Sequence, residues 1–204
     1  MKKSIILFLF SAIFMSCSSD DDNADRDNFF NLKEGNVWVY KRFHFDSEGN
    51  PAQNMSGAID TVRITGTHII DGKKYFKVSH TMFTGSNQSD ERLEYQRVDS
   101  VGHLVNEGGR VIHPGKDLKY TSTTTDQFGK LEYKMEPEKE ISFEGKNYLV
   151  SPYVSYFTPV REDMIAGKGA SLEYQEGIGL VVSHARYISS KIYFEDRLIY
   201  YELK

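Results

Sequence analysis

Residues Ala58 to Phe83 have the sequence AIDTVRITGTHIIDGKKYFKVSHTMF, in which Asp71-Gly72 separates two runs rich in β-branched and aromatic residues. An Asp-Gly pair between two such runs is a strong hairpin signal, because these residues tolerate the positive φ angles of a two-residue turn. The sequence therefore predicts two antiparallel strands, over Ala58 to Ile70 and Lys74 to Phe83, joined by a tight turn.

The same alternation of apolar and polar residues continues on both sides of this hairpin, with Gly- and Asp-rich turns between the runs. In the first run, Trp38 and Tyr40 face away from Val37 and Val39, because side chains alternate along a strand. Further strands are predicted at Val37 to Phe45, Glu91 to Asp99, His103 to Val105, Leu118 to Thr124, Lys130 to Met135, Lys139 to Phe143, Asn147 to Phe157, Gly179 to Ile188 and Ile192 to Glu202. The turns are expected at Ser100 to Gly102, Asp126 to Gly129 and Glu144 to Lys146.

These runs predict an all-β fold, an antiparallel meander of roughly ten strands with little helix. Curling into a barrel or half-open barrel would limit exposed strand edges. A two-sheet sandwich is the alternative. Asp25 to Leu32 or Pro159 to Ile165 could supply one short helix. The longest connection without strand character is Thr158 to Ala170, which is either a lid over the open end of a barrel or a mobile crossover.

The beginning of the chain has the order of a secretory signal. Lys2 and Lys3 are followed by an apolar stretch from Ile5 to Phe14 and by the small residue Ser16. A membrane-spanning helix needs about 20 apolar residues, and this stretch is too short. Residues 1–16 are therefore predicted to be a signal peptide.

Cys17, the only cysteine of the chain, directly follows this leader. No intramolecular disulfide is available to it, and a free thiol is a liability in an oxidising compartment. The tetrapeptide Phe14-Met15-Ser16-Cys17 resembles a bacterial lipobox. We expect Cys17 to be lipidated, and several acyl chains on one residue would hold the protein firmly on a membrane.

A short polar and acidic run, Ser18, Ser19, Asp20, Asp21 and Asp22, follows the cysteine. It resembles the export tag of surface lipoproteins in the Bacteroidota, and it also has the composition of a solvated, disordered spacer. The predicted organisation is a lipidated acidic tether over residues 17–28 and a single β domain over residues 29–204. The expected location is an outer-membrane lipid anchor at the cell surface, with the periplasmic leaflet as the alternative.

Two motifs of the β domain also resemble segments of Bacteroidota surface lipoproteins. The segment FNLKEGNVWVY, Phe30 to Tyr40, resembles the F-P-L-x-x-G-N-x-W-x-Y opening of many uncharacterised Bacteroidota surface lipoproteins. The segment YQEGIGLV, Tyr174 to Val181, is similar to their Y-x-x-G-x-G-L-V stretch. Asn31 and Glu176 stand where the group usually has Pro. The resemblance implies a β-rich envelope domain and no established activity.

Composition and motifs give little support for nucleic-acid binding or for catalysis. The net charge is −4 without a basic cluster, so nucleic acid is not an expected partner. The six histidines lack metal-site spacing, and neither a nucleophile elbow nor a phosphate loop is present. No catalytic residue, metal ligand or cofactor is assigned. Glu162-Asp163 is the starting point for a carboxylate pair, should the protein hydrolyse glycans.

Candidate ligand contacts lie beside the predicted loop. Tyr153, Tyr156, Phe157 and Arg161 are the expected contacts if a sugar or an apolar ligand binds there, although strands select aromatic residues in any case. Asp60-Thr61-Val62 and Asp99-Ser100-Val101 resemble the O-glycosylation site of exported Bacteroidota proteins, which makes Thr61 and Ser100 candidate modification sites.

Three functions remain open, in order of preference. The first is a non-enzymatic surface binding or accessory module, whose partner would be a glycan, an apolar ligand or an outer-membrane protein. The second is a half-barrel protein that handles lipids or lipoproteins in the envelope. The third is a glycan-acting hydrolase, which would need two carboxyl groups roughly 5 to 10 Å apart.

Overall fold

The computed structural model describes residues 29–204, apart from residues 53–56, 86, 89–90 and 187–191. Cys17 and the run from Ser18 to Asp22 lie outside the described residues, so the signal peptide, the lipid anchor and the export tag stay predictions. Within the described residues the chain forms strands, turns and irregular segments, and no helix. The all-β class predicted from the sequence is therefore confirmed.

The fourteen strands of the described residues belong to one sheet, in which every pair of neighbours is antiparallel. Their bounds are β1 Val37–Phe45, β2 Ala58–Ile70, β3 Lys73–Thr84, β4 Asn87–Gln88, β5 Arg92–Val98, β6 Leu104–Asn106, β7 Val111–His113, β8 Thr121–Thr125, β9 Gly129–Met135, β10 Lys139–Phe143, β11 Lys146–Pro159, β12 Gly167–Gln175, β13 Gly179–Arg186 and β14 Tyr193–Glu202. The spatial order is β7-β6-β5-β3-β2-β1-β14-β13-β12-β11-β9-β8, with β10 on β11 and β4 on β3.

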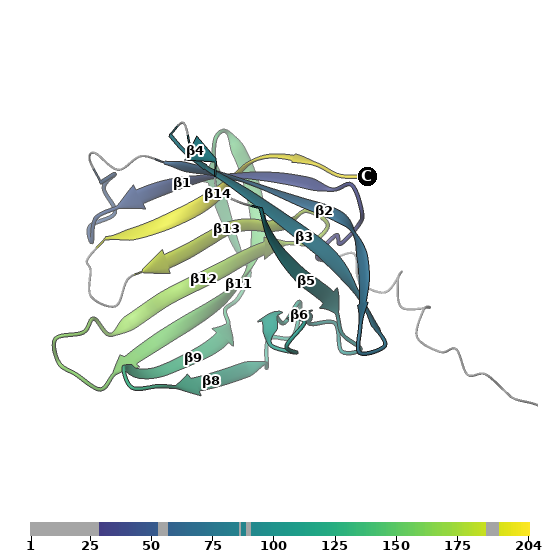
Figure 1. Ribbon diagram of the computed structural model, residues 1–204. Coiled ribbons are helices and arrows are strands. Elements are labelled where there is room, and N and C mark those ends of the chain that lie inside the picture. Colours follow the sequence, from purple (N-terminus) through teal and green to yellow (C-terminus); the bar gives the residue numbers. More distant parts are fainter. Residues whose placement is uncertain (1–28, 53–56, 86, 89–90, 187–191) are drawn as a thin grey trace, which may run out of the picture.

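The sheet curls into an arch that its hydrogen-bonded ladders do not close (Figure 1). Its end strands are β7 and β8, and side chains link the two ends. His113 Nε2 on β7 donates to the carbonyl of Ser151 on β11 at 3.0 Å, and the rings of His113 and Tyr153 of β11 lie 5.9 Å apart. The hairpin of β10 with the first part of β11 forms a second layer, since its Tyr148 belongs to the same core cluster as Val182 of β13.

The turn between β2 and β3 has the geometry that its sequence predicts. Asp71 and Gly72 have φ angles of 48° and 73°, and the ladder resumes at once with Ile70 opposite Lys73. Positive φ at both central residues is the requirement of a type I′ turn, whose twist matches that of the flanking strands.

Several strand and helix predictions are corrected. The segment Thr158 to Ala170, predicted to lack strand character, contains the beginning of β12 at Gly167, so the connection covers only residues 160–166. This strand was not predicted because Gly167 and Gly169 interrupt the alternation of apolar and polar residues. Neither Pro159 to Ile165 nor the described part of Asp25 to Leu32 is helical.

Smaller differences concern short or irregular elements. β4 and β7 were not predicted, because runs of two and three residues carry too little pattern. Leu118 to Tyr120 precede β8 as a turn, stabilised by the hydrogen bond from Tyr120 N to Asp117 O at 3.1 Å.

The two sequence motifs pack against each other. Trp38 Nε1 donates to the carbonyl of Ile178 at 2.7 Å, and the Tyr40 hydroxyl donates to the carbonyl of Leu180 at 2.9 Å. Asn31 Nδ2 donates to the Gly177 carbonyl at 2.8 Å. The motifs are therefore structural: the side chains of the first satisfy the backbone of the second.

A buried aromatic plug occupies one end of the arch. Phe29 and Phe30 are almost fully buried, and their rings contact His113, while Phe30 also contacts Tyr174. His113 is satisfied at both ring nitrogens, because Gly115 N donates to its Nδ1 at 3.1 Å. Burial lowers its pKa to about 4, so this histidine is neutral at physiological pH.

Burial of neutral His113 makes the fold sensitive to acid. The folded-state pKa of about 4 lies below the value of about 6.5 for an unfolded chain, so the unfolded state binds more protons between these values. The free energy of unfolding should fall as the pH drops from 6.5 to 4, with up to about 3 kcal/mol from this residue. Urea titrations followed by tryptophan fluorescence would measure it.

The variant His113→Gln isolates the contribution of the histidine from that of the carboxyl groups. It should be less stable than the wild type at pH 7 and should lose less stability on acidification. Equal losses in the two proteins between pH 6.5 and 4 would contradict the assignment.

Candidate functional site

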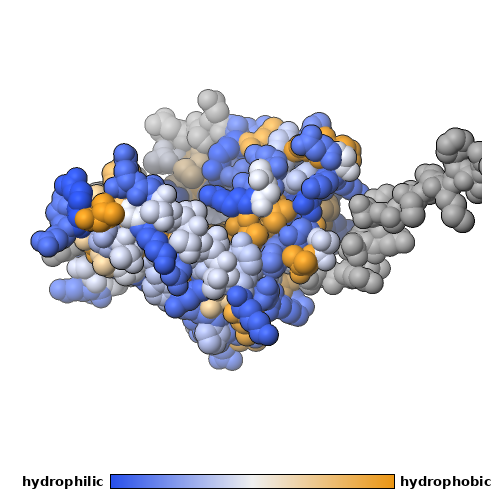
Figure 2. Space-filling view, turned by 90° about the horizontal axis from the view of Figure 1, so that it is seen from below, coloured by the Kyte–Doolittle hydropathy of each residue, from blue (hydrophilic) through white to orange (hydrophobic). Residues whose placement is uncertain are grey.

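A cavity of about 200 Å³ lies on the concave side of the arch. Its floor is apolar and is formed by Phe30, Leu32, Trp38, Val62, Ile64, Val78, Leu104, Leu172, Tyr174 and Leu180. Its polar side chains are Tyr40, Asp60, His80, Arg92, Gln96, Ser183 and Asp196. From below the view of Figure 1, hydrophobic residues gather near the middle of the molecule with hydrophilic residues around them (Figure 2).

The register of three strands brings the central polar residues together. On β2, Asp60 shares a face with Val62, and Val62 is paired with His80 of β3. His80 is paired in turn with Arg92 of β5, two residues before Glu94. His80 is therefore the diagonal neighbour of a carboxylate on each adjacent strand, which is within reach of long side chains.

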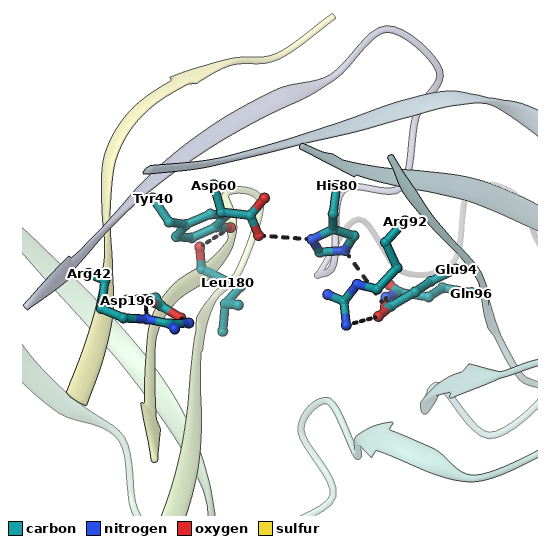
Figure 3. A network of polar contacts seen from close by, with 9 residues as sticks. All are labelled: Tyr40, Arg42, Asp60, His80, Arg92, Glu94, Gln96, Leu180 and Asp196. Atoms are coloured by element: carbon teal, nitrogen blue, oxygen red, sulfur yellow. Dashed lines mark hydrogen bonds and ion pairs between the residues drawn. The ribbon is translucent and has the colours of Figure 1, made fainter. Parts of the chain in front are cut away.

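His80 contacts both of these carboxylates (Figure 3). Its Nδ1 lies 3.0 Å from Asp60 Oδ2, a hydrogen bond, and its Nε2 lies 3.7 Å from Glu94 Oε2, an ion pair without a direct hydrogen bond. Burial lowers the pKa of the imidazole, but the two carboxylates outweigh it and raise the pKa to about 9. Contact with His80 in turn lowers the pKa of Glu94 to about 2. At neutral pH His80 and Glu94 are therefore charged.

Two further ion pairs lie near these groups: one shares Glu94 with His80, and the other joins β1 to β14 (Figure 3). Arg92 contacts Glu94 at 3.2 Å. Arg42 of β1 makes two bonds to Asp196 of β14, at 2.7 and 2.8 Å, and its guanidinium lies 4.1 Å from the ring centroid of Phe194. Three cationic groups thus balance three carboxylates: His80 lies beside Asp60, Arg92 beside Glu94 and Arg42 beside Asp196.

This charge balance indicates what the network can do. A general base must be deprotonated and a general acid protonated at the working pH. At neutral pH, protonated His80 cannot act as a base, and ionised Glu94 cannot act as an acid. Among the described residues, no group of three or more His, Cys, Asp or Glu side chains could hold a metal ion. Because these charged groups already have oppositely charged partners, the network can hold a polar group in a fixed position.

The four predicted ligand contacts lie elsewhere in the molecule. Tyr153 and Phe157 are buried in β11, and the Tyr153 ring contacts Tyr133. The Tyr156 hydroxyl donates to Glu136, which raises the pKa of the tyrosine to about 12. Arg161 is exposed in the connection after β11. None of the four lines the cavity, and their role as ligand contacts stays a prediction.

The other residues singled out in the sequence, the carboxylate pair and the two candidate glycosylation sites, do not line the cavity. Arg161 pairs with Asp163 at the exposed tip of the 160–166 connection, and Glu162 is exposed beside it. Thr61 is half-buried on β2 and alternates with the cavity residues Asp60 and Val62. Ser100 is exposed in the turn between β5 and β6.

Sequence reasoning missed the cavity residues, although a signal was available. Asp60 and His80 stand in phase with the buried residues Val62 and Val78. A polar residue in phase with the apolar face of a strand either needs a buried partner or lines a site. The spacing of the six histidines along the sequence does not reveal which carboxylates lie diagonally opposite them on the adjacent strands.

Comparison with known proteins gives a coarse likeness only. No protein-family model and no curated protein sequence matches the chain. Two solved structures are similar: a "putative lipoprotein" from Parabacteroides distasonis, with 11% identity and a TM-score of 0.47, and a "putative exported protein with YmcC-like fold" from Bacteroides fragilis, with 12% identity and a TM-score of 0.48. Each alignment covers 85% of this chain and 98% of the other. Scores below 0.5 bear on neither function nor mechanism.

The described part of the chain contains no helix long and apolar enough to cross a membrane.

The network predicts an unusually basic histidine. The imidazole of His80 should remain protonated at pH 7.5 and titrate near pH 9, as measured by NMR of the ring protons. Asp60→Asn should lower the pKa of His80, because it removes the carboxylate that accepts the shorter bond. Asp99→Asn, in the turn after β5, is the matched control and should leave the His80 titration unchanged. A wild-type titration near 6.5 would contradict the network.

Proposed function

We propose that the chain is a lipid-anchored envelope protein that binds a small, uncharged amphipathic molecule inside the half-open barrel, without catalysing a reaction. The observation that carries this proposal is the cavity itself, which combines an aromatic and aliphatic floor with a charge-balanced polar network. Ligand sites typically have this composition, a mostly apolar lining with a few fixed polar groups.

The ligand class follows from the lining. Trp38 and Tyr174 provide aromatic surface, and Gln96 and Ser183 add uncharged polar groups. Because the neighbouring carboxylates already have cationic partners, the network does not require a charged ligand. A hydroxyl-rich head on an apolar body would find partners in both parts of the cavity. Its volume, below the roughly 300–1,000 Å³ of pockets for drug-sized ligands, favours a small molecule.

A second candidate is the handling of lipids in the envelope, which the apolar floor favours. The small volume argues for an amphipathic molecule without a long acyl chain. Hydrolysis of glycans is less well supported, since the two carboxylates that line the cavity, Asp60 and Asp196, are each engaged by a cationic partner.

The only tryptophan of the chain lines the cavity and serves as a reporter. Phenyl β-glucoside, which joins an aromatic ring to a hydroxyl-rich head, should change the fluorescence of Trp38 in a saturable manner. Val62→Phe, which fills the floor, should abolish this change, and Gln96→Ala should weaken binding by about fivefold through loss of a hydrogen bond.

Gln175→Ala is the matched control, because Gln175 on β12 accepts a hydrogen bond from Leu149 N and does not line the cavity. It should bind the glucoside as the wild type does. Circular dichroism would confirm that each variant is folded. Binding of the glucoside that survives Val62→Phe in a folded protein would place the ligand elsewhere and would count against the proposal.

The anchor is tested separately. Cys17→Ser should move the protein from the membrane fraction to the soluble fraction and should abolish labelling by radioactive palmitate, since the acyl chains are the proposed attachment. Proteolysis of intact cells then distinguishes the cell surface from the periplasmic leaflet. Retention of the variant in the membrane fraction would show that another part of the chain holds it there.

A further inference from the structure

A second hollow lies on the opposite, convex side of the sheet. It has a volume of about 340 Å³ and is bordered by β10 of the second layer and by β12, β13 and β14. Its lining consists of Lys139, Ile141, Ser142, Phe143, Lys168, Ser171, Glu173, Val182, His184, Glu195 and Arg197. We propose that this outer groove binds a small organic anion, such as a sugar that carries a carboxylate or a phosphate.

The groove is distinct from the interior cavity. Along β13, Ser183 lines the cavity, whereas Val182 and His184 line the groove. Along β14, Asp196 lines the cavity, whereas its neighbours Glu195 and Arg197 line the groove. Side chains alternate between the two faces of a sheet, so the two sites have no lining residue in common.

The groove gathers three cationic groups in a chain whose net charge is −4. Lys139, Lys168 and Arg197 line it, and each has one carboxylate partner, Glu173, Glu136 and Glu195 respectively. His184 also lines the groove, with its Nδ1 3.6 Å from Glu195. An anion would therefore bind to the N–H donors that the carboxylate partners of the three cationic groups leave unused.

Arg197 is held in position before a ligand arrives. Its Nε and Nη2 lie 2.8 and 2.7 Å from Glu195 Oε2. Its guanidinium also lies 5.1 Å from the ring centroids of Phe43 and Phe45 and 5.8 Å from that of Phe143, distances of cation–π contact. A guanidinium has five N–H donors, so donors remain for an anion.

Lys168 supplies the second donor group. Its ammonium is 3.6 Å from Glu136, a long contact, and its side chain is 40% exposed. Lys139 is less available, because it forms a 2.8 Å bond with Glu173, a carboxylate that is almost completely buried. Phe143, Ile141 and Val182 provide apolar surface for the body of the ligand. The lining thus offers both a cationic and an apolar part.

Calorimetric titration with three probes tests this proposal. Glucuronate and glucose 6-phosphate represent the two anionic groups, and glucose is the neutral control. At least one of the two anions should bind, more weakly as salt is added, and glucose should not. Lys168→Gln should weaken binding about tenfold, the loss expected for one charge-assisted hydrogen bond.

Lys130→Gln is the matched control, an exposed lysine of β9 whose ammonium contacts Glu132 and which does not line the groove. It should leave the affinity for the anions unchanged. The proposal is overturned if neither anion binds better than glucose, or if Lys168→Gln binds as well as the wild type. Val62→Phe, which fills the interior cavity, should not affect anion binding, so the outcome is independent of the proposed interior ligand.

Discussion

The curvature of the sheet depends on two side chains of β1 that reach across β14 to the backbone of the neighbouring segment. Trp38 and Tyr40 donate hydrogen bonds to the carbonyls of Ile178 and Leu180, on the far side of the strand that separates them. Each bond contributes about 0.5–1.5 kcal/mol, and the buried aromatic rings add their hydrophobic contribution. Gly179 lies between the two acceptors with a φ of 102°, a backbone conformation that residues with a side chain rarely adopt. The concave side, and the cavity on it, rely on these two hydrogen bonds.

The charged network inside the arch is difficult to explain by stability alone. Removing ionised groups from water costs several kcal/mol for each ion, and a buried ion pair is often no more stabilising than well-packed apolar residues of similar volume. An interior such as this one could have been filled with aliphatic side chains at positions 60 and 80. Balanced charges at the margin of an apolar cavity are better explained by the need to hold a polar group in a fixed orientation.

Local turn chemistry and strand alternation predicted the meander well, because both are properties of neighbouring residues. Asp71-Gly72 is the clearest case: two residues set the turn, and the register of β2 with β3 follows from it. β12 escaped prediction because Gly167 and Gly169 interrupt the alternation of apolar and polar residues at its beginning. The polar residues beside the cavity are harder to predict, because Asp60, His80 and Glu94 meet only through diagonal contacts across three strands. No spacing within the sequence encodes such contacts.

The aromatic plug at the end of the arch also has a mechanical consequence. The chain enters the sheet through Phe29 and Phe30, which are buried, and Phe29 accepts a hydrogen bond from Gly177 N at 3.1 Å. Any tension on the chain ahead of Phe29 therefore acts first on these rings and on the clamp between Asn31 and Gly177. The buried rings of Phe29 and Phe30 would have to leave the core before a pulling force reached the hydrogen bonds of β1.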